Sequence, residues 1–303
     1  MLRDIVPHDA NLGDKNLLVG WRALTTKGSC KTGKLMARPA HLPEYGSPPL
    51  DEVVLGIQFN PAAGYQQIRA GEVWALYRDK FPVVEEQQRL APTFETFGPT
   101  IFARPAFQLV QGAEHDRFWF VNKAGDELIQ FQSDRLLHNW RRRVGVDRPY
   151  PRFDEIAGSL SAEAKALERY FDSLEQQTLD VNQCEMTYIN HFPIDDGGEF
   201  QHLSDYLKVV TFEDEPDDGA IQYRRTIRAD DGTPIARLYC ESNAGIRVDG
   251  AKVITLNISV RGAPRDSTID GALAYLKEGR RLIVTEFTSI TTDKAHRLWE
   301  RSK

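Results

Sequence analysis

Apolar side chains recur at steps of three and four along residues 153–174, and this spacing predicts a helix with one buried stripe. A second long helix is expected over residues 268–287, and a short final helix from Thr292, whose hydroxyl can cap it. Residues 71–82 predict a short helix that ends at its proline. The stripe of the first long helix consists of Phe153, Ile156, Leu160, Ala164, Leu167, Phe171 and Leu174.

Strands are expected where branched, aromatic and polar residues alternate over short runs. The clearest case is a hairpin over residues 117–132, in which apolar runs flank a turn at Gly125. The last third of the chain predicts a three-stranded meander whose first turn contains Asp231 and Gly232. The expected strands outside the first hairpin cover residues 53–59, 107–110, 184–192, 221–228, 235–241 and 252–261.

Hairpins, rather than alternating strand and helix units, predict an α+β fold with a mainly antiparallel sheet and long amphipathic helices packed on one face. Each half of the chain pairs a hairpin with a long helix, which allows two similar halves, although no repeat is visible residue by residue. The expected organisation is a poorly structured segment 1–35, an N-terminal α+β half 36–192, an acidic linker 193–219 and a C-terminal meander with helices 220–303.

The composition narrows the class of protein. The 303 residues carry a formal net charge of -6, which argues against a generally basic nucleic-acid binder but leaves room for a local patch. No run approaches the roughly 18 apolar residues of a membrane span, and the first ten residues lack the apolar core of a signal peptide. Three cysteines without a C-x-x-C pair predict reduced thiols and no zinc site. We therefore expect a cytoplasmic protein without metal or cofactor.

A phosphate-loop pattern occurs once, at residues 28–34, where GSCKTGK matches G-x-x-x-x-G-K. A phosphate loop also needs a serine or threonine next, whose hydroxyl binds magnesium, and a helix that opens there. Leu35 occupies that position and Pro39 follows soon after it. The match therefore does not predict nucleotide binding.

Two polar clusters offer candidate catalytic groups. Asp134 and His138 would be neighbours on a helix, but on a strand they lie about 13 Å apart, and the strand fits because this segment continues the hairpin. Glu185 and His191 would similarly lie about 20 Å apart along one strand. An acid–base site would have to combine His138 or Asp134 with His191 across strands, and structural hydrogen bonding is the plainer interpretation. Arg141 and Asn190 are candidate ligand-binding residues of the same clusters.

The C-terminal meander predicts a polar sheet face. If Ile254, Leu256, Ile258 and Val260 face the helices, alternation sends the polar residues of all three strands to the other side. Such a face could bind an anionic ligand, RNA or a protein partner, or could simply be solvated. Its candidate ligand-binding residues are Arg224, Arg228, Arg237 and Tyr239.

Four segments carry a resemblance: MARPAHLPEYGSPPLDEVVLGIQF, FQSDRLLHNWRR, NQCEMTYINH and ITTDKAHRLWER. Together they resemble a sporadically distributed, uncharacterised bacterial family of conserved hypothetical proteins, over about residues 36–301. The resemblance implies an α+β cytosolic protein and supplies no activity. Members of that family commonly begin at the equivalent of Met36, so residues 1–35 are expected to be an over-long start or an extension.

Three functions remain open. The first is a non-enzymatic binding or regulatory module with an unknown protein or small-molecule partner, accessory to a mobile-element or defence system. The second is a hydrolase or transferase that uses His138 and His191 with Asp134 and Glu185, for which the two imidazoles must converge to about 4 Å. The third is a small-molecule-binding protein, which a cavity of several hundred Å³ between the sheet and the last long helix would favour.

Overall fold

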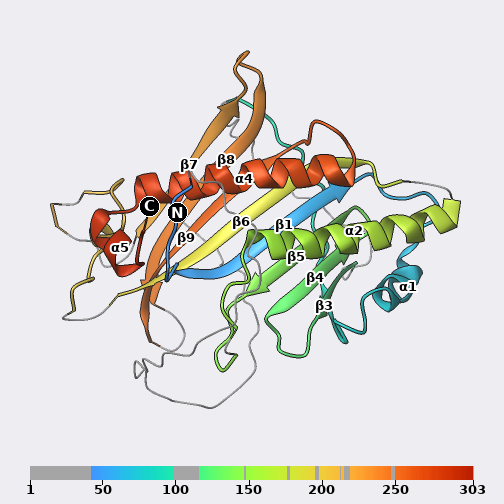
Figure 1. The fold of residues 1–303 in the computed structure, drawn as a ribbon, viewed down its shortest axis with the longest axis horizontal. Coiled ribbons are helices and arrows are strands. Elements are labelled where there is room, and N and C mark those ends of the chain that lie inside the picture. Colours follow the sequence, from blue (N-terminus) through green and yellow to red (C-terminus); the bar gives the residue numbers. More distant parts are fainter. Residues whose placement is uncertain are drawn as a thin grey trace, which may run out of the picture. The chain divides into compact units, whose positions relative to one another are not determined.

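The computed structural model describes residues 42–98, 116–146, 148–175, 178–194, 198–211, 213–214, 219–246 and 250–302. Within these residues, nine strands form one sheet in which every neighbouring pair is antiparallel (Figure 1). The strands are β1 (Leu50–Phe59), β2 (Val83–Gln87), β3 (Arg117–Val121), β4 (Glu127–Gln132), β5 (Arg135–Arg141), β6 (Val181–Pro193), β7 (Gly219–Arg228), β8 (Pro234–Ile246) and β9 (Lys252–Gly262). Their order across the sheet is β2-β3-β4-β5-β1-β6-β9-β8-β7.

Strands from early and late parts of the chain meet in the middle of the sheet, where β1 pairs with β6. β5 lies on the other side of β1, and β9 lies on the other side of β6. From there β2 to β5 and β7 to β9 extend outward as two meanders. Strands from both sides of residues 193–219 thus belong to one sheet, and the predicted α+β fold with an antiparallel sheet is confirmed.

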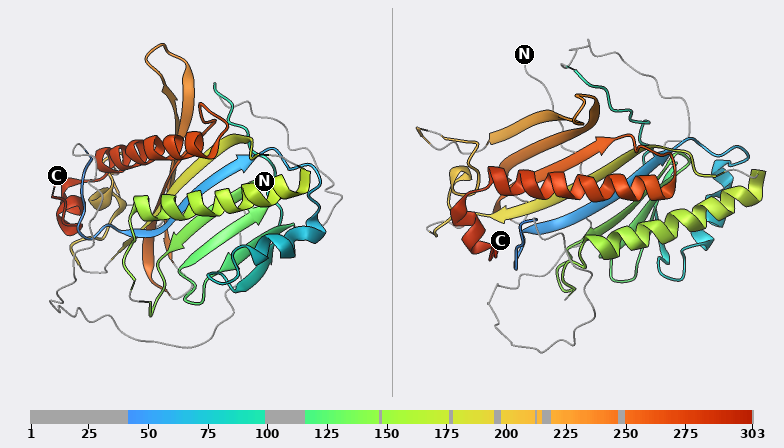
Figure 2. Two further views of the ribbon diagram at one scale, coloured as in Figure 1. Left: turned by 45° about the vertical axis from the view of Figure 1, so that its right-hand side comes forward. Right: turned by 45° about the horizontal axis from the view of Figure 1, so that its top comes forward.

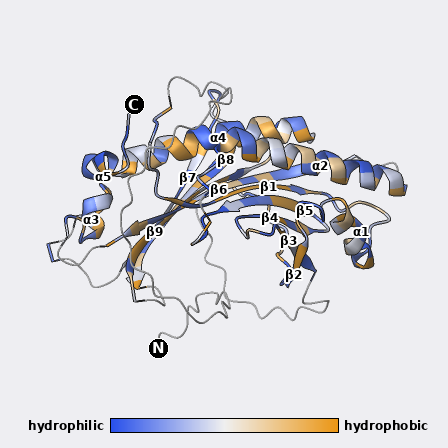
Figure 3. Cartoon of the chain, turned by 60° about the horizontal axis from the view of Figure 1, so that its bottom comes forward, coloured by the Kyte–Doolittle hydropathy of each residue, from blue (hydrophilic) through white to orange (hydrophobic). Residues whose placement is uncertain are grey.

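Two long helices, α2 (Phe153–Glu175) and α4 (Ile269–Ile290), lie over the same face of the sheet (Figure 2). α2 contacts β5 and β1, α4 contacts β6 and β9, and the two helices contact each other. The predicted stripe of α2 is buried except for its last member, Leu174, which is half-buried. Figure 3 shows hydrophobic and hydrophilic residues alternating along strands and helices, as expected for elements with one buried side.

The short helical elements are η1 (Gln67–Arg69), α1 (Ala70–Ala75), α3 (Leu203–Tyr206) and α5 (Asp293–Leu298). The predicted cap of α5 is confirmed, because the Thr292 hydroxyl accepts from the Ala295 amide at 3.1 Å. Thr268 caps α4 in the same way, accepting from the Gly271 amide at 3.0 Å. Among the described helices, none has both the length and the apolar character that crossing a membrane requires.

Several sequence predictions need correction. Strand β2 was missed, because it is an exposed edge strand in which Val83 and Val84 follow each other without alternation. Helix α1 ends at Ala75, earlier than predicted, and turns continue to residue 80. The predicted strand 107–110, the phosphate-loop match and segment 1–35 lie outside the described residues. In the predicted acidic linker, residues 198–211 bury four apolar side chains: Phe200, Leu203, Tyr206 and Leu207.

Candidate functional site

His138 lies on the helix-covered face of β5, fully buried between the sheet and α2. Its Nδ1 lies 3.0 Å and 2.9 Å from the two carboxylate oxygens of Glu163, a buried residue of α2. Its Nε2 is buried and has no hydrogen-bond partner in the described part of the chain. Sequence analysis missed Glu163, although a glutamate directly before Ala164 in an apolar stripe was a usable signal.

His191 lies on the opposite face of the sheet. His138 and Met186 both pair with Leu55 and therefore share its face, whereas His191 lies five residues beyond Met186 on β6, where alternation reverses the face. The His191 Nδ1 lies 3.5 Å from Asp51 Oδ1, and both side chains are about one-third exposed. The structure therefore does not bring the two predicted imidazoles together.

Asp134 and Glu185, the predicted acids, are each held by an arginine. Asp134 Oδ1 accepts from Gln132 Nε2 at 2.8 Å and from Arg135 Nε at 3.1 Å. Glu185 Oε2 accepts from Arg261 Nε at 2.7 Å. Neither carboxylate has a bond to an imidazole among the described residues, so the predicted acid–base pairs do not form here.

The face of the sheet opposite α2 and α4, which we call the polar face, has the residue alternation predicted for the meander. Arg237 lies opposite Arg261 and Tyr239 lies opposite Ser259, while Arg224 on β7 lies opposite Tyr239. The Tyr239 ring lies below two guanidinium groups, 6.0 Å from that of Arg224 and 5.3 Å from that of Arg261.

Three other candidate ligand-binding residues lie away from this group. Arg228 ends β7 and donates to the Gly232 carbonyl at 2.9 Å. Asn190 is buried on the helix-covered side and donates to the Leu256 carbonyl at 3.0 Å. Arg141 donates through Nε to the Gly125 carbonyl at 2.8 Å. Each has a structural partner within its own region of the sheet.

Glu95 is the acidic centre of the polar face. It was not predicted from the sequence, because the residues around it show neither helical nor strand periodicity. Its side chain is only 5% exposed. Its Oε1 lies 2.9 Å from Arg237 Nε, and its Oε2 accepts from the Tyr239 hydroxyl at 2.7 Å. The pKa of Tyr239 is raised by burial and by this bond to a carboxylate. Since Arg237 also donates to the Thr96 carbonyl at 2.6 Å, the network fixes the chain around Glu95 on the sheet.

The same stretch is anchored further along the polar face. The Thr93 amide donates to Gln58 Oε1 at 2.8 Å, and the Ala91 carbonyl accepts from Arg135 Nη2 at 2.9 Å. The Leu90 amide donates to Gln132 Oε1 at 2.9 Å. Residues 90–96 therefore cross the polar face from β4 to β8, over β1.

A cavity of about 550 Å³ lies beside Glu95, between the first half of α4 and the adjoining ends of β6, β8 and β9. Most of its wall is apolar, and two of its lining residues carry a buried polar atom without a hydrogen-bond partner among the described residues. These atoms are the hydroxyl of Tyr275 and the Oε1 of Gln183. Burial, followed by the nearby Cys184 and Glu95, raises the pKa of Tyr275, so its hydroxyl stays protonated at neutral pH.

The backbone is shaped to fit this cavity. A Cβ on Gly262 would lie 2.6 Å from the Tyr275 hydroxyl and 2.7 Å from the Ile235 carbonyl oxygen, both closer than side chains approach. Gly279 lines the same wall, and there a Cβ would meet Met186 at an ordinary 3.7 Å. Close approach therefore requires the first glycine, whereas the second position could hold a Cβ in ordinary van der Waals contact.

The described residues contain no group of three or more His, Cys, Asp and Glu side chains arranged to hold a metal ion. No protein-family model matches the chain, and no curated protein matches it.

Proposed function

We propose that this chain is a non-enzymatic binding protein and that its ligand occupies the 550 Å³ cavity beside Glu95. The observation that carries the proposal is the pair of partnerless polar atoms, Tyr275 Oη and Gln183 Oε1, on two residues that line a mostly apolar wall. Burying a polar group without a hydrogen bond costs about 1–3 kcal/mol, and a ligand that satisfies both atoms would remove this cost.

The charged residues of the cavity wall are paired within the protein or exposed to solvent, which favours an uncharged ligand. Glu278 pairs with Arg281, and Arg265 and Asp266 are exposed charges of opposite sign. The buried carboxylate of Glu95 is already neutralised by Arg237 and accepts from Tyr239, so it does not require a cation. Gln183 Oε1 needs a donor, and the Tyr275 hydroxyl can donate or accept. The ligand class is thus a largely apolar neutral molecule with at least one N–H or O–H group and one acceptor.

The enzyme alternative has less support. It required His138 and His191 to meet, whereas these residues lie on opposite faces of the sheet. His138 is enclosed by the core with Glu163, where a substrate has no access. These contacts support a binding module better than an enzyme. Such a module would couple its ligand to a protein partner, as an accessory to a mobile-element or defence system.

The topology also supports a proposal of two similar halves. In each half a first strand lies at the centre of the sheet, β1 or β6, and a meander returns to lie beside it as β5 or β9. A long helix follows in both cases, α2 or α4. We retain the resemblance to a bacterial family, the cytoplasmic location and the acidic boundary as proposals consistent with this arrangement.

A test uses Nile red, an uncharged solvatochromic dye, as a probe of the apolar wall; the dye has no N–H or O–H group, but its carbonyl can accept from the Tyr275 hydroxyl. Wild-type protein should increase its emission saturably, and Ala274→Phe, which adds bulk to the cavity wall on α4, should weaken binding at least tenfold. Lys277→Phe is the matched control, because Lys277 is exposed on the same helix and does not line the cavity. Equal binding by both variants, or no saturable binding by the wild type, would refute the proposal.

A second test concerns the polar atoms. Tyr275→Phe removes a hydroxyl without a partner, so the variant should melt at or above the wild-type temperature while binding Nile red several-fold more weakly. Tyr223→Phe is its control, because that hydroxyl donates to Glu286 at 2.6 Å and its loss should lower the melting temperature. Native mass spectrometry of the protein purified from its host would then identify a retained natural ligand.

A further inference from the structure

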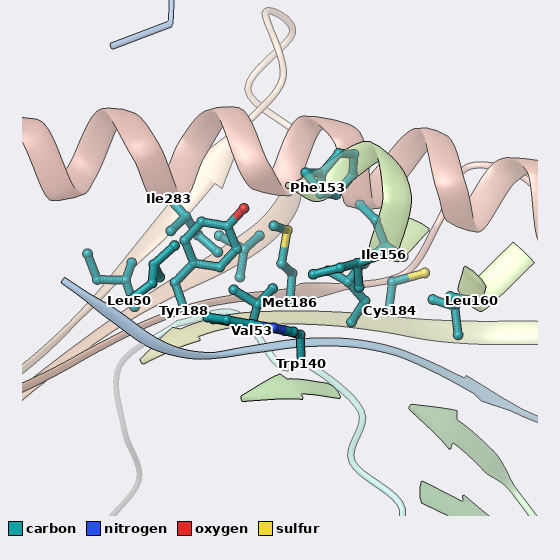
Figure 4. Packing of buried hydrophobic residues seen from close by; sticks show 14 of the residues in the cluster. Leu50, Val53, Trp140, Phe153, Ile156, Leu160, Cys184, Met186, Tyr188 and Ile283 are labelled. Carbon is teal, nitrogen blue, oxygen red and sulfur yellow. The ribbon is translucent and has the colours of Figure 1, made fainter. Parts of the chain in front are cut away.

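A second, smaller cavity of about 40 Å³ lies between the start of α2 and the middle of α4. This volume holds roughly three water-sized spheres, enough for a compact polar group. Leu50, Tyr188, Phe153 and Ile283 form part of its wall and lie close together in the core beneath α4 (Figure 4). Most of this wall is apolar, and two arginines, Arg152 and Arg280, complete it.

Arg280 is a buried cation with too few acceptors. It is only 5% exposed, and its guanidinium stacks on the Phe153 ring, 5.0 Å from the centroid. Its one ion pair in the described residues is with Asp154 at 3.8 Å, and that carboxylate is about half exposed. No described residue accepts a hydrogen bond from its five N–H donors. Asp154 is a distant and half-exposed partner, so the guanidinium donors stay available for an acceptor that lies closer.

Arg152 adds a second cation at the same cavity. Its φ of 77° lies in the left-handed region, which is unfavourable for any residue other than glycine. The strained backbone places its guanidinium 6.0 Å from the centroid of the Tyr150 ring. The Tyr150 hydroxyl lies 3.0 Å from that of Tyr188, and burial raises the pKa of Tyr150, so its hydroxyl remains a neutral group. The cavity thus combines two cations with the protonated hydroxyl of Tyr150.

We propose that this cavity binds the carboxylate of a small organic acid, with Arg280 and Arg152 as its cationic partners. A carboxylate fits the small volume, and its two oxygens match the planar guanidinium donors. Because the space holds only about three water-sized spheres, the carboxylate end of the acid occupies it beside the apolar Leu50 and Ile283, and the rest of the acid extends through the open side of the cavity. This site is separate from the 550 Å³ cavity, so the proposal does not depend on the function proposed above.

The test measures the melting temperature and isothermal titration heats with benzoate, and with inorganic phosphate at matched ionic strength. Benzoate should stabilise the wild type saturably, and Arg280→Met should weaken its binding at least tenfold. Arg281→Met is the matched control, because Arg281 is the next residue of α4, is 43% exposed and pairs with Glu278. Equal loss in both variants, or binding of phosphate without benzoate, would overturn the assignment.

Arg152→Gly is a second variant that tests the same site, in case Arg280→Met fails to fold. Glycine adopts a φ of 77° without strain, so this variant should melt higher than the wild type in the absence of benzoate while binding benzoate several-fold more weakly. Unchanged benzoate binding by this well-folded variant would refute the proposal. Ala274→Phe, which alters only the larger cavity, should bind benzoate like the wild type.

Discussion

The Nδ1 of His138 on β5 lies 2.9 Å from Oε2 of Glu163 on α2, so a buried polar pair joins the sheet to the helix that covers it. The Tyr77 hydroxyl donates to the Glu163 carbonyl at 2.9 Å, and the Phe81 ring meets the imidazole edge-on. Buried pairs of this kind cost the most when one partner is removed and the other stays buried. The pair therefore acts as a structural connection in the core.

Substituting the two histidines should have very different effects on stability. His138→Ala leaves the Glu163 carboxylate buried without its partner and should lower the free energy of unfolding by about 3 kcal/mol. His191→Ala removes a partly exposed contact with Asp51 and should cost less than about 1 kcal/mol. Urea denaturation of both variants measures the difference. Equal costs would show that His138 is not held as described.

Alanine substitutions at two glycines beside the larger cavity should change the stability of the protein in opposite directions. Gly262→Ala should destabilise by about 1–3 kcal/mol, because the new Cβ meets a backbone oxygen at 2.7 Å that cannot move aside. Gly279→Ala should stabilise by about 1 kcal/mol, because alanine favours the helix and the Cβ has room. Thermal denaturation measures both changes. Combining Gly262→Ala with Tyr275→Phe should not restore stability, because the contact with the Ile235 carbonyl remains.

The environment of His296 predicts a loss of stability in mild acid. Burial and the positive charges of Arg301 and Lys208 lower the pKa of His296 from its ordinary value of 6.5, outweighing Asp293. Its Nδ1 accepts from Arg301, and its Nε2 lies 2.8 Å from the Thr291 hydroxyl. Below pH 6.5 the unfolded chain binds a proton that folded His296 does not, so the free energy of unfolding falls as the pH falls. The effect levels off below the folded-state pKa.

The free energy of unfolding, measured by denaturation between pH 7.5 and pH 5, should therefore depend less steeply on pH for His296→Gln than for the wild type. Carboxylates that titrate in this range are present in both proteins, so the difference in slope isolates the imidazole. Identical slopes would mean that His296 is protonated equally well in the folded and unfolded chains.

The two described cysteines should be unreactive in the folded protein. Burial raises the pKa of Cys184 to about 12. Burial also raises the pKa of Cys240 to about 11, where the hydrogen bond with Tyr223 lowers it and the charge of Glu286 raises it. Only the thiolate reacts quickly, so a Cys30→Ser variant should consume almost no Ellman's reagent at pH 8 until urea unfolds it. Rapid labelling of the folded variant would contradict the described burial.

The sequence was most informative where residue spacing within one element decides the structure. Spacing of three and four predicted α2, and alternation of two placed Arg237, Tyr239 and Arg261 on one face of the meander. Local spacing contains no information about register between distant strands. Sequence analysis could therefore place neither histidine on its face of the whole sheet.

The parts of the site that were missed depend on long-range contacts. Glu95 reaches its partner Tyr239 across 144 positions of the chain, from a stretch without periodicity. Tyr275 lies on a predicted helix, but its hydroxyl has no partner because it lies beside a cavity that forms where the ends of three strands meet the helix. Such features follow from the assembled fold and have no counterpart in local composition.

The strand order also determines when the chain is vulnerable during its synthesis. β1 pairs with β5 early, but its other edge waits for β6, and β6 in turn lies beside β9, the last strand to be made. While residues between Pro193 and Lys252 are being added, the nascent protein exposes the unpaired backbone of a long central strand. Such an edge can pair with a neighbouring polypeptide. Fragments of the chain that end in this interval would therefore be prone to aggregate through that edge.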